Sequence, residues 1–178
     1  MPARGVDSCA VANLLTILRM VLAPAVMLAL LRRGPNSRLA AALFCAGGLT
    51  DGLDGAFARA SHTTSTLGRD LDPLADKLLV DGALVILARR GRAPWLLVGS
   101  LLLRDCVVTL LRQRDSAALT PSRAARLKTA LLYAGVFGLI AGPERSRLHR
   151  IAHALTTAAV GLCLLSAGEY LGRLRDAS

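Results

Sequence analysis

Four aspartates stand at helical spacings within residues 51–77 of a chain whose formal net charge is +10. Asp51 and Asp54 are three residues apart, and Asp72 and Asp76 are four apart, so each pair shares one face of a helix. If the residues between the pairs form a turn, the two helices are antiparallel neighbours and the four carboxylates converge. The spacing therefore predicts a site whose chemistry needs clustered negative charge.

Such a cluster of carboxylates favours the binding of divalent cations. Carboxylates at the edge of a low-dielectric region repel one another, and some must take up protons unless cations lie between them. Hard oxygen ligands suit Mg²⁺, Mn²⁺ or Ca²⁺, whereas Zn²⁺ prefers His or Cys. The four cysteines are far apart and form no CxxC motif. Four carboxylates are enough for two divalent ions, the arrangement used for in-line displacement at phosphorus.

A simpler interpretation treats these residues as acids at helix ends. Asp72 followed by Pro73 is typical of an N-cap and the first residue of a helix. A proline at this position predicts a helix start or a kink near residue 72, and a helix start also accounts for Asp70. It does not account for Asp51 and Asp54, which follow an apolar run at a helix end where the dipole disfavours negative charge.

Two glycines and one arginine extend the pattern. Gly55 directly follows an acid, and Gly68 is four residues before Asp72, on the same helix face. Small residues beside metal ligands allow a phosphate-bearing ligand to approach the backbone closely. Arg59 offers a bidentate partner for phosphate oxygens. The pattern favours a phosphate-containing substrate.

The spacing D-x2-D-G-x2-A-R-x8-G-x3-D-x3-D resembles the signature of the CDP-alcohol phosphatidyltransferase family at every fixed position. The eight positions are Asp51, Asp54, Gly55, Ala58, Arg59, Gly68, Asp72 and Asp76. The resemblance implies an all-α integral membrane enzyme with six transmembrane helices. Such an enzyme transfers a phosphatidyl group from a CDP-linked lipid to an alcohol, releases CMP and uses two Mg²⁺ or Mn²⁺ ions.

The resemblance also implies a role for each signature residue. Asp51, Asp54 and Asp72 would be metal ligands. Asp76 would contact the metals and act as the catalytic base that takes the proton of the attacking hydroxyl. The remaining positions would shape the CDP site: Gly55, Ala58, Arg59 and Gly68.

The rest of the chain predicts a membrane bundle that positions this site. Hydrophobic residues make up 53% of the chain and the mean hydropathy is +0.49. Residues 11–31 contain one charge, Arg19, and are long enough to cross a hydrocarbon core of roughly 30 Å. Five further apolar runs follow, which gives six candidate spans: 39–50, 78–88, 94–111, 129–142 and 151–168.

The connections between these runs are short, polar and rich in turn residues, so we expect one membrane domain over residues 1–178. They are residues 32–38, 61–66, 89–92, 113–123 and 142–147. Basic residues lie on both sides of the bundle, and their balance slightly favours cytoplasmic termini. The basic surface suits anionic membrane lipids. Aromatic residues make up only 3%, so we expect no nucleic-acid partner.

Four other segments are similar to the phosphatidylglycerophosphate synthases of this family, which use CDP-diacylglycerol and glycerol 3-phosphate. They are residues 13–19, 72–77, 104–112 and 125–132. The similarity implies a homodimer in the bacterial inner membrane, with its active site facing the cytoplasm. One departure is Arg104-Asp105, where that group tends to have Arg-Glu.

A phosphorylated acceptor needs cations on the active-site side, and Arg104, Arg112 and Lys128 are candidates for its phosphate. An arginine inside a membrane span normally has a partner or a ligand, so Arg104 is equally expected to pair with Asp81 or Asp105. Arg112 and Lys128 are equally expected to extend their charged ends to the membrane interface.

Other functions stay open at this point. Within the family, a cardiolipin synthase would use phosphatidylglycerol, and another relative would use inositol phosphate. Aspartate-rich membrane prenyltransferases also use Mg²⁺ and a diphosphate, but they have two separate acidic motifs, and only one acidic cluster is present here. A divalent-cation carrier could use the same carboxylates, but it has no need of Arg59 and the two glycines at these spacings.

Overall fold

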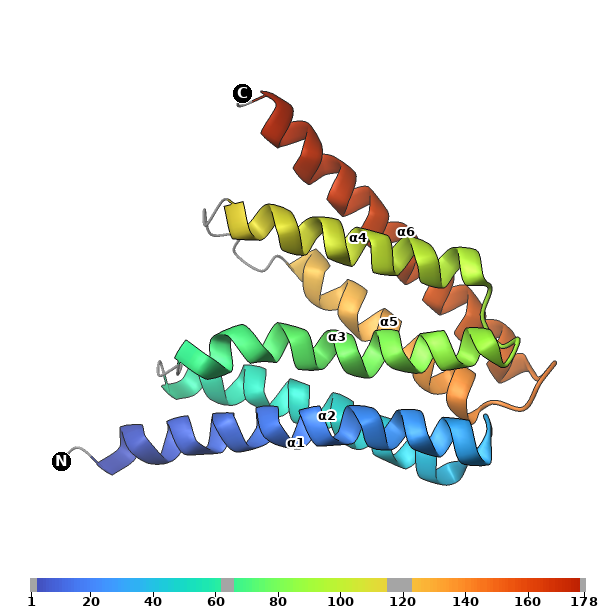
Figure 1. The fold of residues 1–178 in the computed structure, drawn as a ribbon, viewed down its shortest axis with the longest axis horizontal. Coiled ribbons are helices and arrows are strands. Elements are labelled where there is room, and N and C mark those ends of the chain that lie inside the picture. The colour runs from blue at the N-terminus through green and yellow to red at the C-terminus, as the bar shows by residue number, and fades with distance from the viewer. Residues whose placement is uncertain (1–2, 62–65, 115–122, 177–178) are drawn as a thin grey trace. The chain divides into compact units, whose positions relative to one another are not determined.

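The computed structural model describes the side chains of residues 14, 17–50, 77–109 and 127–168, and outside these ranges only the bounds of helices. Residues 1–2, 62–65, 115–122 and 177–178 are not described. Within this described part the chain forms six helices and no strand, which confirms the predicted all-α class (Figure 1). The helices are α1 (Ala3–Arg33), α2 (Arg38–Ser61), α3 (Thr66–Arg89), α4 (Trp95–Arg114), α5 (Arg123–Ala141) and α6 (Arg147–Asp176).

Local turn chemistry sets several of these bounds. Gly34, with φ of 76°, follows the last residue of α1 and donates its N–H to the carbonyl of Leu30 at 3.0 Å. Gly91 adopts the same left-handed conformation, with φ of 74°, just after α3. At the start of α6, the hydroxyl of Ser146 accepts the N–H of His149 at 3.1 Å, as an N-cap does.

The predicted apolar runs lie within the helices except for their end residues Pro94 and Gly142, and the predicted polar connections separate them. The predicted helix start near residue 72 is wrong: α3 begins at Thr66, so Asp72 and Pro73 fall inside the bounds of the helix. The alternative, a kink near residue 72, stays a prediction. A proline in a helix interior costs roughly 3 kcal/mol because it removes one hydrogen bond and crowds the preceding turn. Most helix stability in proteins comes from tertiary packing, so a long packed helix can offset that cost.

Within the described part, one helix segment is both long enough and apolar enough to cross a membrane. Arg147–Gly168 has a mean hydropathy of 1.6, and two shorter apolar segments are Arg38–Thr50 and Leu127–Ala141. The predicted spans at 11–31 and 94–111 extend past the described side chains. The bundle of six transmembrane helices is consistent with the all-α fold and stays a prediction.

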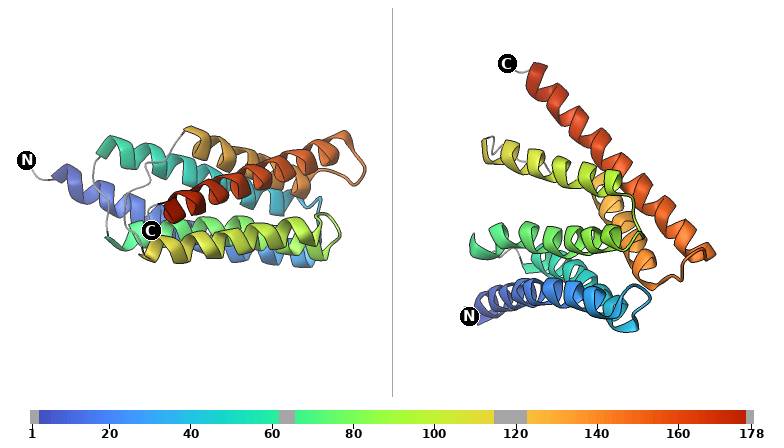
Figure 2. Two further views of the ribbon diagram at one scale, coloured as in Figure 1. Left: turned by 90° about the horizontal axis from the view of Figure 1, so that it is seen from above. Right: turned by 45° about the vertical axis from the view of Figure 1, so that its right-hand side comes forward.

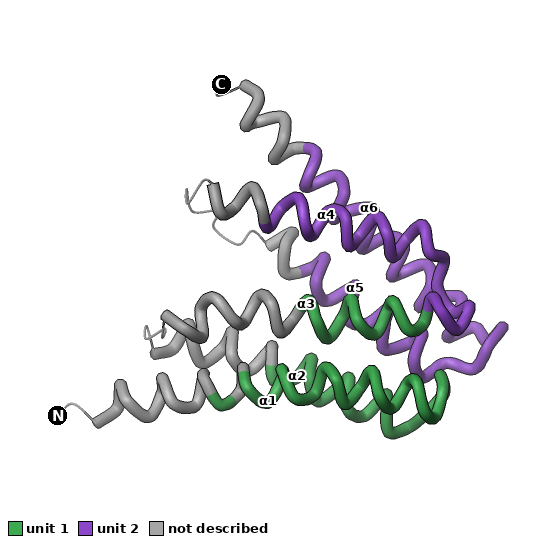
Figure 3. The backbone as a smooth tube through the Cα atoms, viewed as in Figure 1, with its two compact units in different colours: residues 1–87 green, residues 88–178 purple. Residues whose placement is uncertain are grey.

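Residues 1–87 form the first of two compact units, which contains α1, α2 and most of α3 (Figure 3). Helices α1 and α2 pack against each other. The fully buried side chains at the centre of this unit include Val26, Leu30, Phe44, Leu79 and Leu84. Arg19 is buried with them, at 1% exposure.

Residues 88–178 form the second unit, in which α6 packs against both α4 and α5. Helices α5 and α6 lie side by side in both views of Figure 2. Glycines of α5 allow this close packing: a Cβ on Gly138 would lie 2.7 Å from the Cβ of Ala152, and one on Gly135 would collide with Thr156. The core of this unit includes Val136, Leu139, Ile140, Ala152 and Ala159.

Candidate active site

The eight signature residues fall on two consecutive helices of the first unit, and their side chains lie outside the described residues. Within the bounds of α2 are Asp51, Asp54, Gly55, Ala58 and Arg59, and within those of α3 are Gly68, Asp72 and Asp76. The predicted convergence of the four carboxylates therefore stays a prediction. What the structure does describe is the packing of the residues that directly adjoin them.

A close contact joins α2 to α3 next to the signature. A Cβ on Gly47 would lie only 2.5 Å from a methyl group of Leu79, so this glycine lets the two helices approach. Gly47 is about one helical turn before Asp51, and Leu79 is about one turn after Asp76. The two helices are thus in close contact about one turn away from the first and the last aspartate of the signature.

The end of the described part of α2 is also fixed internally. Thr50 is buried, at 8% exposure, and its hydroxyl donates a hydrogen bond to the carbonyl of Gly47 at 2.7 Å. A threonine that bonds back into its own helix satisfies its hydroxyl donor without needing water. Asp51 therefore follows a well-packed turn of helix.

No other part of the described chain offers a competing metal site. The described side chains contain no group of three or more His, Cys, Asp or Glu residues that could hold a metal ion. The carboxylates of the signature are the remaining donor set, and an all-oxygen set of this kind is chemically suited to Mg²⁺ or Mn²⁺.

Arg104, a predicted contact of the acceptor phosphate, has a carboxylate partner. Its Nη1 lies 2.6 Å from Oδ1 of Asp105, and the two side chains are 21% and 14% exposed. Of the two carboxylates that the sequence left open, Asp105 is therefore the one seen in contact. The Nε of Arg104 is buried and has no hydrogen-bond partner among the described residues.

Lys128 lies in the same region of the second unit as this pair. Arg104, Asp105 and Lys128 are all close enough to exert a Coulombic effect on Cys163, which is buried on α6. Two of the three predicted acceptor cations, Arg104 on α4 and Lys128 on α5, thus belong to the second unit. The side chain of the third, Arg112, lies outside the described residues.

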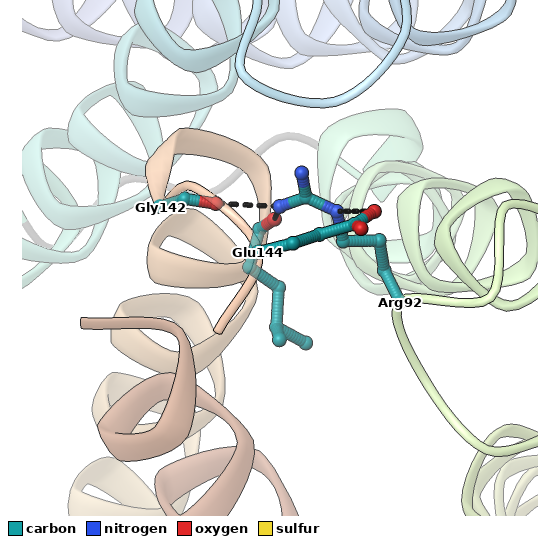
Figure 4. Close-up of polar contacts among 4 residues, drawn as sticks. Arg92, Gly142 and Glu144 are labelled. Carbon is teal, nitrogen blue, oxygen red and sulfur yellow. Dashed lines mark hydrogen bonds and ion pairs between the residues drawn. The ribbon is translucent and has the colours of Figure 1, made fainter. Parts of the chain in front are cut away.

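A buried arginine that the sequence did not single out closes one end of the second unit (Figure 4). Arg92 is 3% exposed, and its Nη1 donates to the carbonyls of Leu139 at 3.2 Å and Gly142 at 2.5 Å. Its Nε is 3.3 Å from Oε1 of Glu144, whose side chain is 70% exposed. The positive charge sits at the C-terminus of α5, where the helix dipole favours it.

Nothing in the sequence distinguished Arg92 from the other arginines of its turn, because all of them follow the same apolar run. Its contacts are with backbone carbonyls and one exposed acid, so we assign it a structural role. The signature residues, Arg104 and Lys128 remain the candidates for chemistry.

The chain is similar to known proteins over most of its length. Residues 9–165 match a sequence model of the CDP-alcohol phosphatidyltransferase family. A probable phosphatidylglycerophosphate synthase of Mycobacterium tuberculosis is 35% identical over 93% of this chain and 82% of its own length. Two proteins named CDP-diacylglycerol–glycerol-3-phosphate 3-phosphatidyltransferase also match. That of Cereibacter sphaeroides is 34% identical over 88% of this chain and 75% of its own length. That of Pseudomonas fluorescens is 32% identical, with coverages of 89% and 87%.

Proposed function

Because the chain belongs to the CDP-alcohol phosphatidyltransferase family, we propose that it transfers the phosphatidyl group of CDP-diacylglycerol to glycerol 3-phosphate. The products are phosphatidylglycerophosphate and CMP, and the reaction belongs to phospholipid biosynthesis. The observation that supports this acceptor best is the naming of several similar proteins for this reaction, with identities of 32–35% over most of the chain.

Four carboxylates would hold the metal ions and one of them would move the proton. Asp51, Asp54, Asp72 and Asp76 form an all-oxygen donor set, which fits two Mg²⁺ or Mn²⁺ ions. Such ions, when bound, neutralise the negative charge of a pyrophosphate. Gly55, Ala58, Arg59 and Gly68 would receive the CDP group, with the guanidinium of Arg59 on phosphate oxygens.

The reaction is a single displacement at the phosphorus that bears diacylglycerol. The hydroxyl oxygen of glycerol 3-phosphate forms a bond to this phosphorus, and Asp76 takes the hydroxyl proton. The bond from the same phosphorus to the oxygen shared with CMP breaks, and CMP leaves with that oxygen. The residues of the site contribute mainly by holding the two reactants in line.

The predicted cations would bind the acceptor phosphate. Arg104 is held by Asp105 through Nη1, so its guanidinium keeps a fixed direction and would donate to a phosphate oxygen. Lys128 adds a second cation in the same region. Arg112 would add a third.

We place the protein in the bacterial inner membrane, as a homodimer whose active site faces the cytoplasm. Only 28% of the apolar window in Arg147–Gly168 is buried within the fold. A core helix of a soluble protein would be mostly covered, so this apolar surface suits lipid. A donor with one end in lipid and one in water also requires a site at the interface.

A screen of acceptors tests this function. Purified protein with Mg²⁺ or Mn²⁺ and CDP-diacylglycerol should release CMP when glycerol 3-phosphate is added. Phosphatidylglycerol and inositol phosphate, tested in parallel, should give little CMP. Release with one of these two alone would reassign the acceptor, and no release with any of the three would exclude the proposed reaction.

Asp76→Asn should reduce CMP release by at least about a thousandfold, since it removes both a metal ligand and the base. Asp70→Asn is a matched control, because Asp70 lies in the same segment but outside the signature. It should keep activity within a few-fold of wild type. Equal losses in the two variants would remove the special role of Asp76.

Lys128→Ala should raise the KM for glycerol 3-phosphate about tenfold and leave the KM for CDP-diacylglycerol nearly unchanged, as expected when one charge-assisted bond is lost. The comparison of the two KM values is the measurement. Parallel increases in both would place Lys128 outside the acceptor site.

A further inference from the structure

The end of the second unit where α5 ends and α6 begins has a strong excess of positive charge. The connections there, residues 88–95 and 139–150, contain six arginines and one acid, Glu144. The contacts of Arg92 with Leu139, Gly142 and Glu144 show that the two connections lie together. Five of the six arginines are exposed, and we name them the arginine surface: Arg89, Arg90, Arg145, Arg147 and Arg150.

Helix stability does not explain this placement. Arg147 and Arg150 lie in the first turn of α6, which contains no acidic residue. The N-terminus of a helix is its positive end, so basic residues there are unfavourable for the helix itself. Glu144, the one acid at this end, already forms the ion pair with Arg92. Positive charge is therefore left in excess at a position where both the side chains and the helix attract an anion.

Apolar and aromatic side chains adjoin the arginine surface. Trp95, the single tryptophan of the chain, is 56% exposed at the start of α4, and Leu96 beside it is 86% exposed. Tryptophan is enriched where a membrane meets water, because its ring is apolar and its N–H is polar. An exposed tryptophan and leucine next to exposed arginines match a bilayer interface, with its hydrocarbon on one side and its headgroups on the other.

We propose that the arginine surface binds the headgroups of anionic phospholipids, with Trp95 at the boundary of the acyl chains. Guanidinium groups bind phosphate in a bidentate manner, and each basic residue near an anionic membrane adds about 1 kcal/mol of attraction. This binding uses none of the signature residues and none of the proposed acceptor cations Arg104, Arg112 and Lys128. It rests on the proposed membrane location and is independent of the identity of the acceptor.

Trp95 provides the measurement, because it is the only tryptophan. The full chain is placed in phosphatidylcholine nanodiscs that contain increasing fractions of a brominated lipid, either brominated phosphatidylglycerol or brominated phosphatidylcholine. Bromine quenches tryptophan fluorescence on contact. We expect brominated phosphatidylglycerol to quench at an about fivefold lower mole fraction, in keeping with the gain from one basic residue. Equal quenching by the two lipids overturns the proposal.

The triple variant R145Q/R147Q/R150Q should remove most of this preference. The variant R32Q/R33Q/R38Q takes the same charge from exposed arginines of the first unit, and it should keep the preference. Equal losses in the two variants, or a preference that survives in the first, overturn the proposal. CMP release and the melting temperature report separately on activity and folding, so a failure of the proposed reaction is distinguishable from a failure here.

A second measurement needs no variant. Raising the salt concentration from about 0.1 M to about 1 M shortens the Debye length from about 10 Å to about 3 Å. The ratio of the mole fractions at which the two brominated lipids quench the wild type should then fall towards one. A preference that is unchanged by salt overturns the electrostatic assignment. Addition of inorganic phosphate at constant ionic strength should not relieve quenching, and relief would identify the surface as a site for a free anion.

Discussion

The two compact units use glycine in different ways. In the first unit, Gly47 and Gly82 face side chains: a Cβ on the former would meet a methyl group of Leu79, and one on the latter would meet the end of Met27. In the second unit, Gly135 faces the hydroxyl of Thr156 and also the backbone of α6, because a Cβ there would lie 2.8 Å from the backbone nitrogen of Thr156 and 3.1 Å from the carbonyl oxygen of Ala152. A flexible side chain can move aside, whereas a helix backbone cannot move without separating the helices.

This difference suggests distinct functions for the two packing modes. Helices α5 and α6 are fixed backbone to backbone, so they can hold Lys128, which lies on α5, in a constant position. The contacts of α2 and α3 beside the signature are made by adjustable side chains. An adjustable contact is compatible with carboxylates that must accommodate metal ions and a large lipid nucleotide.

Gly135→Ala should have the largest effect on stability, because the added methyl group meets backbone atoms that cannot yield. We expect a loss of about 2–3 kcal/mol in the free energy of unfolding, the upper part of the range for overpacked positions. Thermal unfolding in detergent measures it. Gly161→Ala is the matched control, since a Cβ there has no neighbour within 4 Å, and it should leave the melting temperature unchanged or raised.

Arg92→Ala should have the next largest effect. It removes two hydrogen bonds from a buried charge to the carbonyls of Leu139 and Gly142, and we expect a loss of about 2 kcal/mol. Glu144→Gln should change stability by less than about 1 kcal/mol, because Glu144 is 70% exposed and water screens its ion pair. If the two variants are equally destabilised, the carbonyl contacts are not the main role of Arg92.

Gly82→Ala should have the smallest effect of the three. The methyl group displaces only the end of Met27, an unbranched side chain that adopts new rotamers at low cost. We expect a change of less than about 1 kcal/mol by the same unfolding measurement. A loss as large as that of Gly135→Ala would show that side-chain and backbone contacts are equally rigid here, and the contrast between the units would be lost.

Much of the fold was predictable, because apolar runs and polar turns alternate clearly along the chain. The family was also predictable from eight spaced residues, and the match over residues 9–165 confirms it. The start of α3 was not, because the Asp72-Pro73 pair is a strong local signal that the longer helix outweighs. The role of Arg92 was hidden as well, since its partners lie 47 and 50 residues further along the chain.

The chemistry of the site stays a prediction, because the aspartate side chains lie outside the described residues. Spacing alone predicts that the aspartates share one face of each helix. It could not choose between Asp81 and Asp105 as the partner of Arg104, because that choice depends on rotamers and on helix packing. The carboxylate seen in contact is the nearest one in sequence, with an Nη1 to Oδ1 distance of 2.6 Å.

The long sequence separation of the Arg92 contacts has a consequence for the biogenesis of the protein. When the ribosome has just completed the connection before α4, the carbonyls that will receive this guanidinium have not yet been synthesised, because Gly142 comes 50 residues later. A charge without its partners stays in water. We therefore expect the Arg92 side chain to remain hydrated during translation and to be buried only when α5 has been inserted, which makes Arg92 a marker of the order of assembly.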